Sequence, residues 1–302
     1  MKPIFCLTLC LSFVFTACAT PNAQDPDVRS NSANSEATQP TTEAARIVAL
    51  TSLTADILQQ LDVEKLVGIP GNPLLSADSR FKGIETVSSG RTEPNLEKIV
   101  ALEPDLVIGA SGFHDQAAQR LEELGISTQL TDVDSLASLE ELTIALAATI
   151  NADPQPLLQQ YENCVAQSPT EGPSTLVLVS RQPILSPNQE SWAGDLLSKF
   201  NIRNLTAELQ QESAAEMPGQ TAFRGYITLS AEKIVEADPE VLIVVDTGES
   251  ILEQFQSDPF WRQLQAVEGD RVYVFDYYGL VNPGSIDSIE QACAQLNQII
   301  NN

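Results

Sequence analysis

The sequence contains a single histidine, His114, among 302 residues. Sites that capture bare zinc or manganese use several imidazoles or a mixed cluster of histidines and carboxylates. A Ser/His/Asp triad also requires a histidine, and the single histidine here does not complete a plausible set. No GxSxG motif, phosphate-binding P-loop or GxGxxG motif after a predicted strand occurs in the chain. The sequence therefore disfavours direct metal capture and catalysis, and we expect a protein that is not an enzyme and has no cofactor.

Basic residues are scarce as well. The chain has 16 lysines and arginines against 41 acidic residues, and its formal net charge is −25. A chain without a basic stripe cannot offset the repulsion of phosphates, which excludes nucleic acid as a partner. Attraction to an anionic lipid surface by charge alone is excluded for the same reason. Aromatic residues make up only 6% of the chain, so Leu, Ile and Val must form most of its cores.

The five cysteines include no CxxC pair, the spacing that zinc and redox sites use. Cys6 and Cys10 lie in the leader described below, and Cys164 and Cys293 lie in the body of the chain. An exported protein could join the last two in a disulfide. Two buried thiols are an equal alternative, because sequence does not fix their geometry.

Residues 1–17 have the pattern of a signal peptide. Lys2 is followed by an apolar run that is too short to span a membrane as a mature helix, and small residues precede Cys18. The run FTAC resembles a lipoprotein box, in which the cysteine becomes the lipidated N-terminus. We therefore predict lipidation of Cys18, with simple secretion and a free Cys18 as the alternative.

Residues 18–45 contain almost no large apolar side chain and are rich in Ala, Ser, Thr, Asn, Gln and Pro. This composition cannot bury enough apolar surface to fold and predicts a disordered tether. We expect a globular body on the extracytoplasmic side of the cytoplasmic membrane, held there only by the lipid.

One stretch occurs twice. Glu97 to Ile108 reads EKIVALEPDLVI, and Glu232 to Ile243 reads EKIVEADPEVLI. Each copy has a helix-capping residue two positions before its Glu, so each Glu falls in the first helical turn. An apolar run that is typical of a buried parallel strand follows. One long-range repeat of this kind predicts two similar lobes.

Strands and helices alternate through the rest of the chain, which predicts parallel α/β lobes. We expect an α/β fold with two Rossmann-like lobes bridged by a long helix, and ligand binding in the cleft between the lobes. The predicted boundaries are 46–150 for the N-terminal lobe, 151–172 for the connecting helix and 173–302 for the C-terminal lobe. Within the second lobe we expect one helix over Ser250–Gln263.

The stretch from Gly90 to Ile108, which contains GRTEPNLE, resembles the signature of ABC-importer substrate-binding proteins for iron–siderophore complexes and cobalamin. It is most similar to members of the ferrichrome and ferric-citrate type. The run from Phe260 to Tyr273 resembles the last α/β unit of that family. The resemblance implies a monomer that holds a metal chelate between its lobes and docks on an ABC permease. It also places the family's two permease-contacting glutamates at Glu97 and Glu232, for which helix-dipole stabilisation is the simpler alternative.

The resemblance places a ligand-binding arginine at Arg91. In the second lobe, Arg181 directly follows the strand expected over Thr175–Ser180, and Arg224 lies in the loop before the second copy of the repeat. Arginine presents a planar fork to carboxylate or hydroxamate oxygens. Surface ion pairs are the alternative for all three. The remaining candidates are hydroxyl groups after the first strand and aromatic side chains in loops: Thr51, Ser52, Phe113, Trp192 and Tyr278. Packing is an equal alternative for the two second-lobe aromatics. We interpret His114 as an exposed loop residue near the cleft.

The expected ligand is a ferric chelate, either a siderophore complex or ferric citrate. Haem and cobalamin are the alternatives within the same type of importer; haem propionates would suit the arginines better than the weakly charged cobalamin. An exported sensor or store of chelates, without a permease, is a third possibility.

Overall fold

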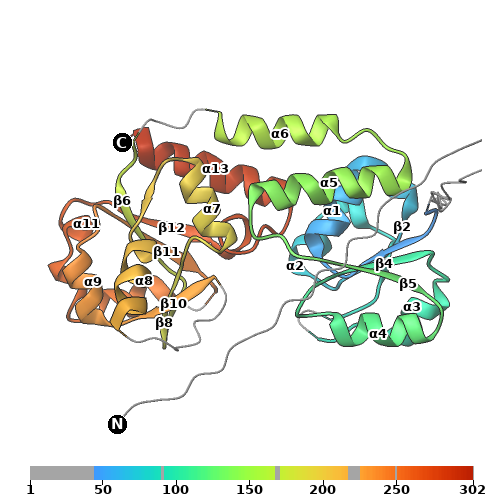
Figure 1. The fold of residues 1–302 in the computed structure, drawn as a ribbon, viewed down its shortest axis with the longest axis horizontal. Coiled ribbons are helices and arrows are strands. Elements are labelled where there is room, and N and C mark those ends of the chain that lie inside the picture. Colours follow the sequence, from blue (N-terminus) through green and yellow to red (C-terminus); the bar gives the residue numbers. More distant parts are fainter. Residues whose placement is uncertain (1–43, 90–91, 167–170, 217–224, 249, 302) are drawn as a thin grey trace, which may run out of the picture. The chain divides into compact units, whose positions relative to one another are not determined.

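The computed structural model describes residues 44–89, 92–166, 171–216, 225–248 and 250–301, all of which belong to one compact unit. Two parallel sheets and one small antiparallel sheet are packed among helices (Figure 1). The predicted α/β fold with two lobes is confirmed, because each lobe has a parallel sheet of its own. The signal peptide, Cys18 and nearly all of the tether lie outside the described residues.

The sheet of the first lobe has the strand order β3-β2-β1-β4-β5. Its strands are β1 (Ile47–Ala49), β2 (Leu66–Ile69), β3 (Glu85–Thr86), β4 (Leu106–Ala110) and β5 (Ser127–Thr131). The helices among them are α1 (Ser52–Asp62), η1 (Val63–Lys65), α2 (Pro73–Ala77), η2 (Ser79–Phe81), α3 (Leu96–Ala101) and α4 (Asp115–Glu123). All strand pairs are parallel; every residue of β1 is buried, and β4 is buried except at its two end residues, which are partly exposed. Helices cover both faces of such a sheet.

The sheet of the second lobe has the order β12-β11-β6-β9. Its strands are β6 (Ser174–Leu178), β9 (Arg203–Asn204), β11 (Val241–Asp246) and β12 (Val272–Asp276). The helices of this lobe are α7 (Trp192–Lys199), α8 (Leu205–Glu216), α9 (Ala231–Ala237), α10 (Ile251–Gln256), η3 (Trp261–Gln263), α11 (Gln265–Glu268) and α12 (Tyr277–Leu280). The repeated strand β11 pairs with β6 as β4 pairs with β1.

Three helices pack together beside the sheets: α5 (Leu136–Ile150), α6 (Gln155–Val165) and α13 (Ile286–Asn301) (Figure 1). Their buried side chains belong to one apolar cluster that also includes residues of both parallel sheets. Tyr161 of α6 is hydrogen-bonded to Thr143 of α5 at 3.0 Å. Cys164 of α6 forms a disulfide with Cys293 of α13, and their Cα atoms are 5.6 Å apart.

The second lobe differs from the prediction in two places. The helix expected over Ser250–Gln263 is broken after α10, because Pro259 lacks a backbone N–H and disfavours helical backbone at the residue before it. The prediction also missed an antiparallel sheet, ordered β10-β8-β7. Its strands are β7 (Ser180–Arg181), β8 (Ile184–Pro187) and β10 (Tyr226–Leu229). This sheet gives the second lobe a surface that the described part of the first lobe lacks.

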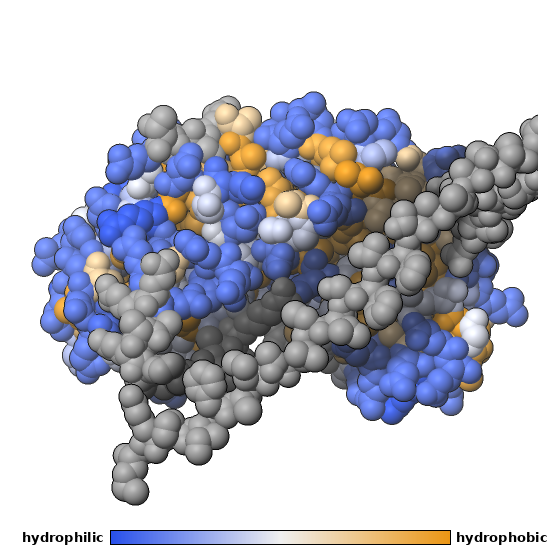
Figure 2. Space-filling view, viewed as in Figure 1, coloured by the Kyte–Doolittle hydropathy of each residue, from blue (hydrophilic) through white to orange (hydrophobic). Residues whose placement is uncertain are grey.

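The face shown in Figure 2 is mainly hydrophilic, with apolar areas between hydrophilic residues. Among the described residues, no helix combines the length and the apolar character that crossing a membrane would need.

Candidate functional site

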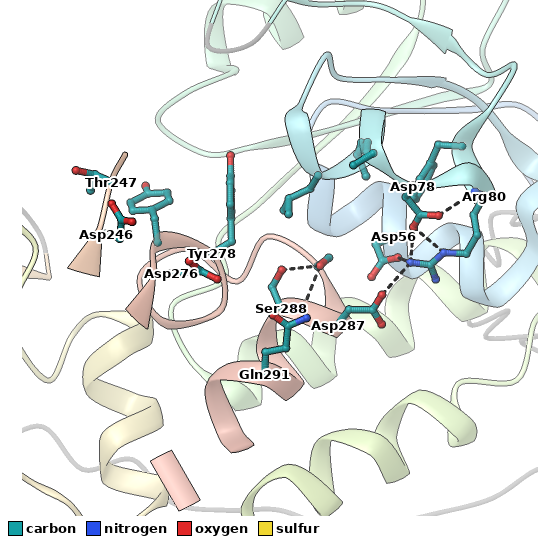
Figure 3. A pocket seen from close by; sticks show the side chains of 16 residues that line it. Asp56, Asp78, Arg80, Asp246, Thr247, Asp276, Tyr278, Asp287, Ser288 and Gln291 are labelled. Atoms are coloured by element: carbon teal, nitrogen blue, oxygen red, sulfur yellow. Dashed lines mark hydrogen bonds and ion pairs between the residues drawn. The ribbon is translucent and has the colours of Figure 1, made fainter. Parts of the chain in front are cut away.

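Residues of both lobes line a cavity of about 560 Å³ (Figure 3). The first lobe contributes side chains of α1, α2 and η2. The second lobe contributes the carboxyl ends of β11 and β12, the start of α12 and the first turns of α13. Ligand sites of parallel α/β proteins form outside the carboxyl ends of strands, so this is the described cavity that best matches the expected cleft.

Arg80 is the centre of an ion-pair network on one wall of the cavity. Its Nη2 lies 2.6 Å from Asp78 Oδ2, 3.2 Å from Asp56 Oδ1 and 3.3 Å from Asp287 Oδ2. The hydrogen bond from Arg80 holds the pKa of Asp78 below its ordinary value and raises the pKa of Arg80 itself. Three carboxylates therefore already compensate this guanidinium, and Arg80 has little charge left to attract an anion.

Asp56 joins the first lobe to the start of α13. Its side chain is fully buried, and its Oδ2 accepts a hydrogen bond from the Ile286 N–H at 2.7 Å. Burial raises the pKa of Asp56 in spite of that bond and of the nearby Arg80. Ser285 completes the cap of α13, because its Oγ accepts from the Ser288 N–H. The network thus holds the two lobes together at this wall.

The opposite wall consists of aromatic and acidic side chains at the ends of β11 and β12. Tyr278, a predicted ligand residue, lines the cavity, and its hydroxyl oxygen accepts a hydrogen bond from Asn72 Nδ2 at 3.3 Å. Its ring stands edge-on to that of Tyr277, with the centroids 5.4 Å apart. Asp246 and Asp276 line the same side of the cavity as Tyr278 (Figure 3).

The described wall of this cavity carries five aspartates and one arginine. We expected three arginines, but Arg91 and Arg224 lie outside the described residues. Arg181 is described and does not line this cavity: it forms a two-pronged ion pair with Asp258, with contacts of 2.9 and 2.6 Å. The pair lines a different cavity on the second lobe, next to Glu232. The positive charge expected here is therefore not supplied by the residues that the structure describes.

The other predicted ligand residues are spread over several environments. Thr51 Oγ1 accepts from the Thr54 N–H at 3.1 Å and so helps to start α1, next to the buried Ser52. The Phe113 side chain is 89% exposed. Trp192 is only 3% exposed, and its indole N–H donates to the Gly279 carbonyl at 2.8 Å. Trp192 therefore offers almost no surface to a ligand, which corresponds to the packing alternative.

His114 is not the exposed loop residue that we expected. It is half-buried, and its Nδ1 accepts a hydrogen bond from the Ala110 N–H at 2.9 Å. Burial lowers the pKa of His114. The imidazole ring thus closes the turn between β4 and α4, directly beside Phe113. Among the described residues, no group of histidines, cysteines and carboxylates is arranged to hold a metal ion.

Glu97 and Glu232 are both exposed in the first turns of α3 and α9. Hydrogen bonds from its own backbone N–H and from the Ser230 hydroxyl lower the pKa of Glu232. The sequence prediction missed Arg80 and Asp56. The sequence did contain one signal for Asp56, because it is the only charged residue in the mainly apolar stretch Leu53–Leu58.

Several proteins similar to this chain are ferric-citrate-binding or haem uptake proteins. The Fe(3+)-citrate-binding protein YfmC of Bacillus subtilis is 25% identical over 246 residues, 76% of this chain and 73% of that protein. The Fe(3+) dicitrate-binding periplasmic protein FecB of Escherichia coli is 26% identical over 243 residues, 76% of each. The haem uptake protein IsdE of Staphylococcus aureus is 22% identical over 283 residues, 88% of this chain and 91% of that protein.

Solved structures show the same fold. An ABC transporter substrate-binding protein of Listeria monocytogenes has a TM-score of 0.68 and 21% identity, covering 85% of this chain and 98% of its own. The vitamin B12 binding protein BtuF of Vibrio cholerae has a TM-score of 0.65 and 20% identity, with the same two coverages.

The match to a protein family covers most of the body of the chain, residues 47–278. Proteins of that family are extracytoplasmic, bind small-molecule chelates, work with ABC permeases and are not enzymes. The expectation of a binding protein, drawn from the missing catalytic motifs and the GRTEPNLE stretch, is confirmed at this level. The chain belongs to the periplasmic binding protein family.

Proposed function

We propose that this protein captures a ferric chelate, ferric citrate or an iron–siderophore complex, between its lobes and delivers it to an ABC permease. The observation that carries the proposal is the similarity to two ferric-citrate-binding proteins over three quarters of the chain. The cavity lined by both lobes supports it, since Tyr278 there presents an aromatic face and a hydroxyl. A lipid on Cys18 keeps the protein at the membrane.

The proposal assigns the anionic part of the chelate to Arg91 and Arg224. Arg80 is a poor candidate, because Asp56, Asp78 and Asp287 already compensate its charge. Ferric citrate carries several carboxylates, and an arginine fork binds a carboxylate through two parallel hydrogen bonds. The acidic wall of the cavity would repel such a ligand unless these arginines face it.

Fluorescence titration with ferric citrate, ferric hydroxamates, haem and cobalamin tests the ligand. We expect an anionic ferric chelate to bind best, and Arg91→Ala to weaken it about 10- to 100-fold, the loss expected for a charge-assisted hydrogen bond. Arg203→Ala is the matched control, because Arg203 forms an exposed pair with Glu208. Tighter binding of cobalamin than of any ferric chelate would reverse the assignment.

Haem is a second candidate because IsdE matches this chain over a larger share of its length than the citrate-binding proteins do. Haem would bind in the same cavity between the lobes, with its ring stacked on a tyrosine and its propionates paired with an arginine. The titration separates the two ligands directly, since haem binding produces its own absorption spectrum.

Delivery is assigned to Glu97 and Glu232. Both carboxylates are exposed at matching places of the repeat and lie on separate lobes. Replacing both with glutamine should leave chelate affinity unchanged and abolish uptake of iron by cells. Unchanged uptake would leave a chelate sensor or store as the better description. Replacing Cys18 with serine should release the protein from the membrane fraction.

A further inference from the structure

The second lobe has a cavity of about 680 Å³ beside Glu232. Its apolar surface comes from Ile184 of β8, Val235 of α9 and Pro259 and Phe260 of the segment after α10. The hairpin of β7 and β8 forms one wall of this cavity, and the described part of the first lobe has no such hairpin. We call these four residues, with Glu232 and Glu236 at the rim, the α9 groove.

Charges are distributed unevenly around the α9 groove. Asp258 lies at one end, but Arg181 binds both of its carboxylate oxygens and cancels its charge. Glu232 is exposed, and its carboxylate accepts hydrogen bonds from its own backbone N–H and from the Ser230 hydroxyl in the same helix turn. Glu236 is paired with Lys233 at 3.0 Å, and because the Lys233 and Glu236 side chains are 40% and 69% exposed, this pair is weak. The groove therefore has an apolar floor and a negative rim on the side of α9.

The spacing along α9 joins the two properties on one helix face. Val235 and Glu236 lie three and four positions after Glu232, so the three side chains share a face. The opposite side of the helix packs into the core through Ile234, which is fully buried. A partner that pairs a cation with Glu232 would consequently place its neighbouring side chain over Val235.

We propose that the α9 groove receives an apolar side chain from the permease segment whose cation pairs with Glu232. The inference rests on the proposed delivery to a permease and names the second contact that such docking makes. The apolar floor contributes affinity by excluding water, and the carboxylate at the rim contributes orientation. At α3 of the first lobe, Lys98 binds Glu85 and the Thr86 carbonyl instead, so the two docking points are different in kind.

The test uses the full-length protein in its native cells, with variants replacing the chromosomal copy. Val235→Trp fills the groove, and Val274→Trp is the matched control, since Val274 is an exposed valine on β12. We expect Val235→Trp to bind ferric citrate as the parent does and to lower uptake of radioactive iron, presented as ferric citrate, about tenfold or more. Val274→Trp should change neither quantity.

A photo-crosslinking side chain at position 235 gives an independent measurement that does not depend on how tryptophan fits. We expect it to attach to a permease transmembrane subunit, identified by mass spectrometry, and expect no such product from position 274. Absence of that product from position 235 would overturn the inference, as would loss of ferric citrate binding in Val235→Trp. Dimerisation through position 235, seen as a crosslink between two copies, would also overturn it.

Glu232→Gln separates this inference from the proposed function. If Glu232→Gln lowers uptake and Val235→Trp does not, the groove is not a docking point but delivery to a permease stands. If neither Val235→Trp nor the double variant Glu97→Gln, Glu232→Gln lowers uptake and ferric citrate still binds, the proposed delivery itself fails.

Discussion

The repeated units α3–β4 and α9–β11 share the four residues EKIV and make several equivalent contacts. Asn95 and Ser230 cap the two helices by accepting from the N–H groups of Lys98 and Lys233, at 3.0 and 3.3 Å. The isoleucine of each EKIV stretch is fully buried. These shared contacts need the cap and the isoleucine, whereas both glutamates are exposed, and Glu232 bonds only to groups of its own first turn in the described structure.

The acidic residue after each proline has a matching role. Asp105 accepts hydrogen bonds from the N–H groups of Ala45 and Arg46, both at 2.9 Å, just before β1. Glu240 accepts from the N–H and the hydroxyl of Ser174 at the start of β6, at 2.7 and 2.9 Å. Each carboxylate thus fixes the start of the neighbouring strand. The repeat therefore preserves a strand clamp as well as a helix.

The two units differ in how their helices meet the rest of their lobe. Lys98 ties α3 to β3, whereas Lys233 bonds to Glu236 of its own helix. The end of α9 is held instead by Asp238, which accepts from the Gln265 N–H at 2.8 Å. The same EKIV residues thus form different surfaces in the two lobes. At α9, the helix face that carries Glu232 continues into the α9 groove.

The largest difference between the lobes should appear on reduction of the disulfide. Cys164 and Cys293 are 129 positions apart, and the loop that they close contains both sheets of the second lobe and none of the first. The chain-entropy account gives about 5 kcal/mol for a loop of this length. We expect a Cys164→Ser, Cys293→Ser double variant to lose about that much stability. Hydrogen exchange should accelerate in β11 more than in β4; equal acceleration would show that the lobes unfold as one.

Removing the buried isoleucines compares the two cores. Ile99→Ala and Ile234→Ala should each cost about 2–5 kcal/mol, because each removes a fully buried side chain. Ile234 belongs to a larger buried cluster than Ile99, so we expect the higher cost for Ile234→Ala. Denaturant unfolding measures both. Exposed Val100, one position after Ile99, is the control, and Val100→Ala should change stability by less than about 0.5 kcal/mol.

The sequence was sufficient for the two lobes because strand and helix periodicity and the EKIV repeat are local patterns. The cavity wall was out of reach, because Asp56, Arg80 and Asp287 meet only after folding. Arg181 was interpreted as a ligand residue from its place after a strand. The unpredicted hairpin of β7 and β8 instead places it against Asp258. Trp192 was placed in a loop, whereas it begins a helix capped by Ser191 and is buried there.

The strand clamps give a pH-dependent test. The hydrogen bonds from Ser174 hold the pKa of Glu240 below its ordinary value. A carboxyl with a lowered folded-state pKa contributes stability above its unfolded pKa and loses it as the pH falls through the folded pKa. Because Glu240 is exposed and solvent screens its interactions, Glu240→Gln should lower stability at pH 7 by at most about 1 kcal/mol and flatten the acid limb of the stability curve. Thermal unfolding between neutral and acidic pH measures this, and an unchanged acid limb would argue against the clamp.

The helix caps should give the smallest effect and the sharpest distinction between the two units. Asn95→Ala and Ser230→Ala each remove one side-chain acceptor from a first turn, at a cost of about 1 kcal/mol or less. Ser230→Ala has a second consequence, because the Ser230 hydroxyl also helps to lower the pKa of Glu232. We expect the pKa of Glu232 to rise towards its ordinary value in Ser230→Ala, as NMR titration of the carboxyl would show.

The carboxylate would still be ionised at neutral pH, so uptake should persist although the helix is weaker. Loss of uptake in Ser230→Ala without loss of chelate binding would mean that docking depends on how the first turn of α9 orients Glu232, and not on the negative charge alone.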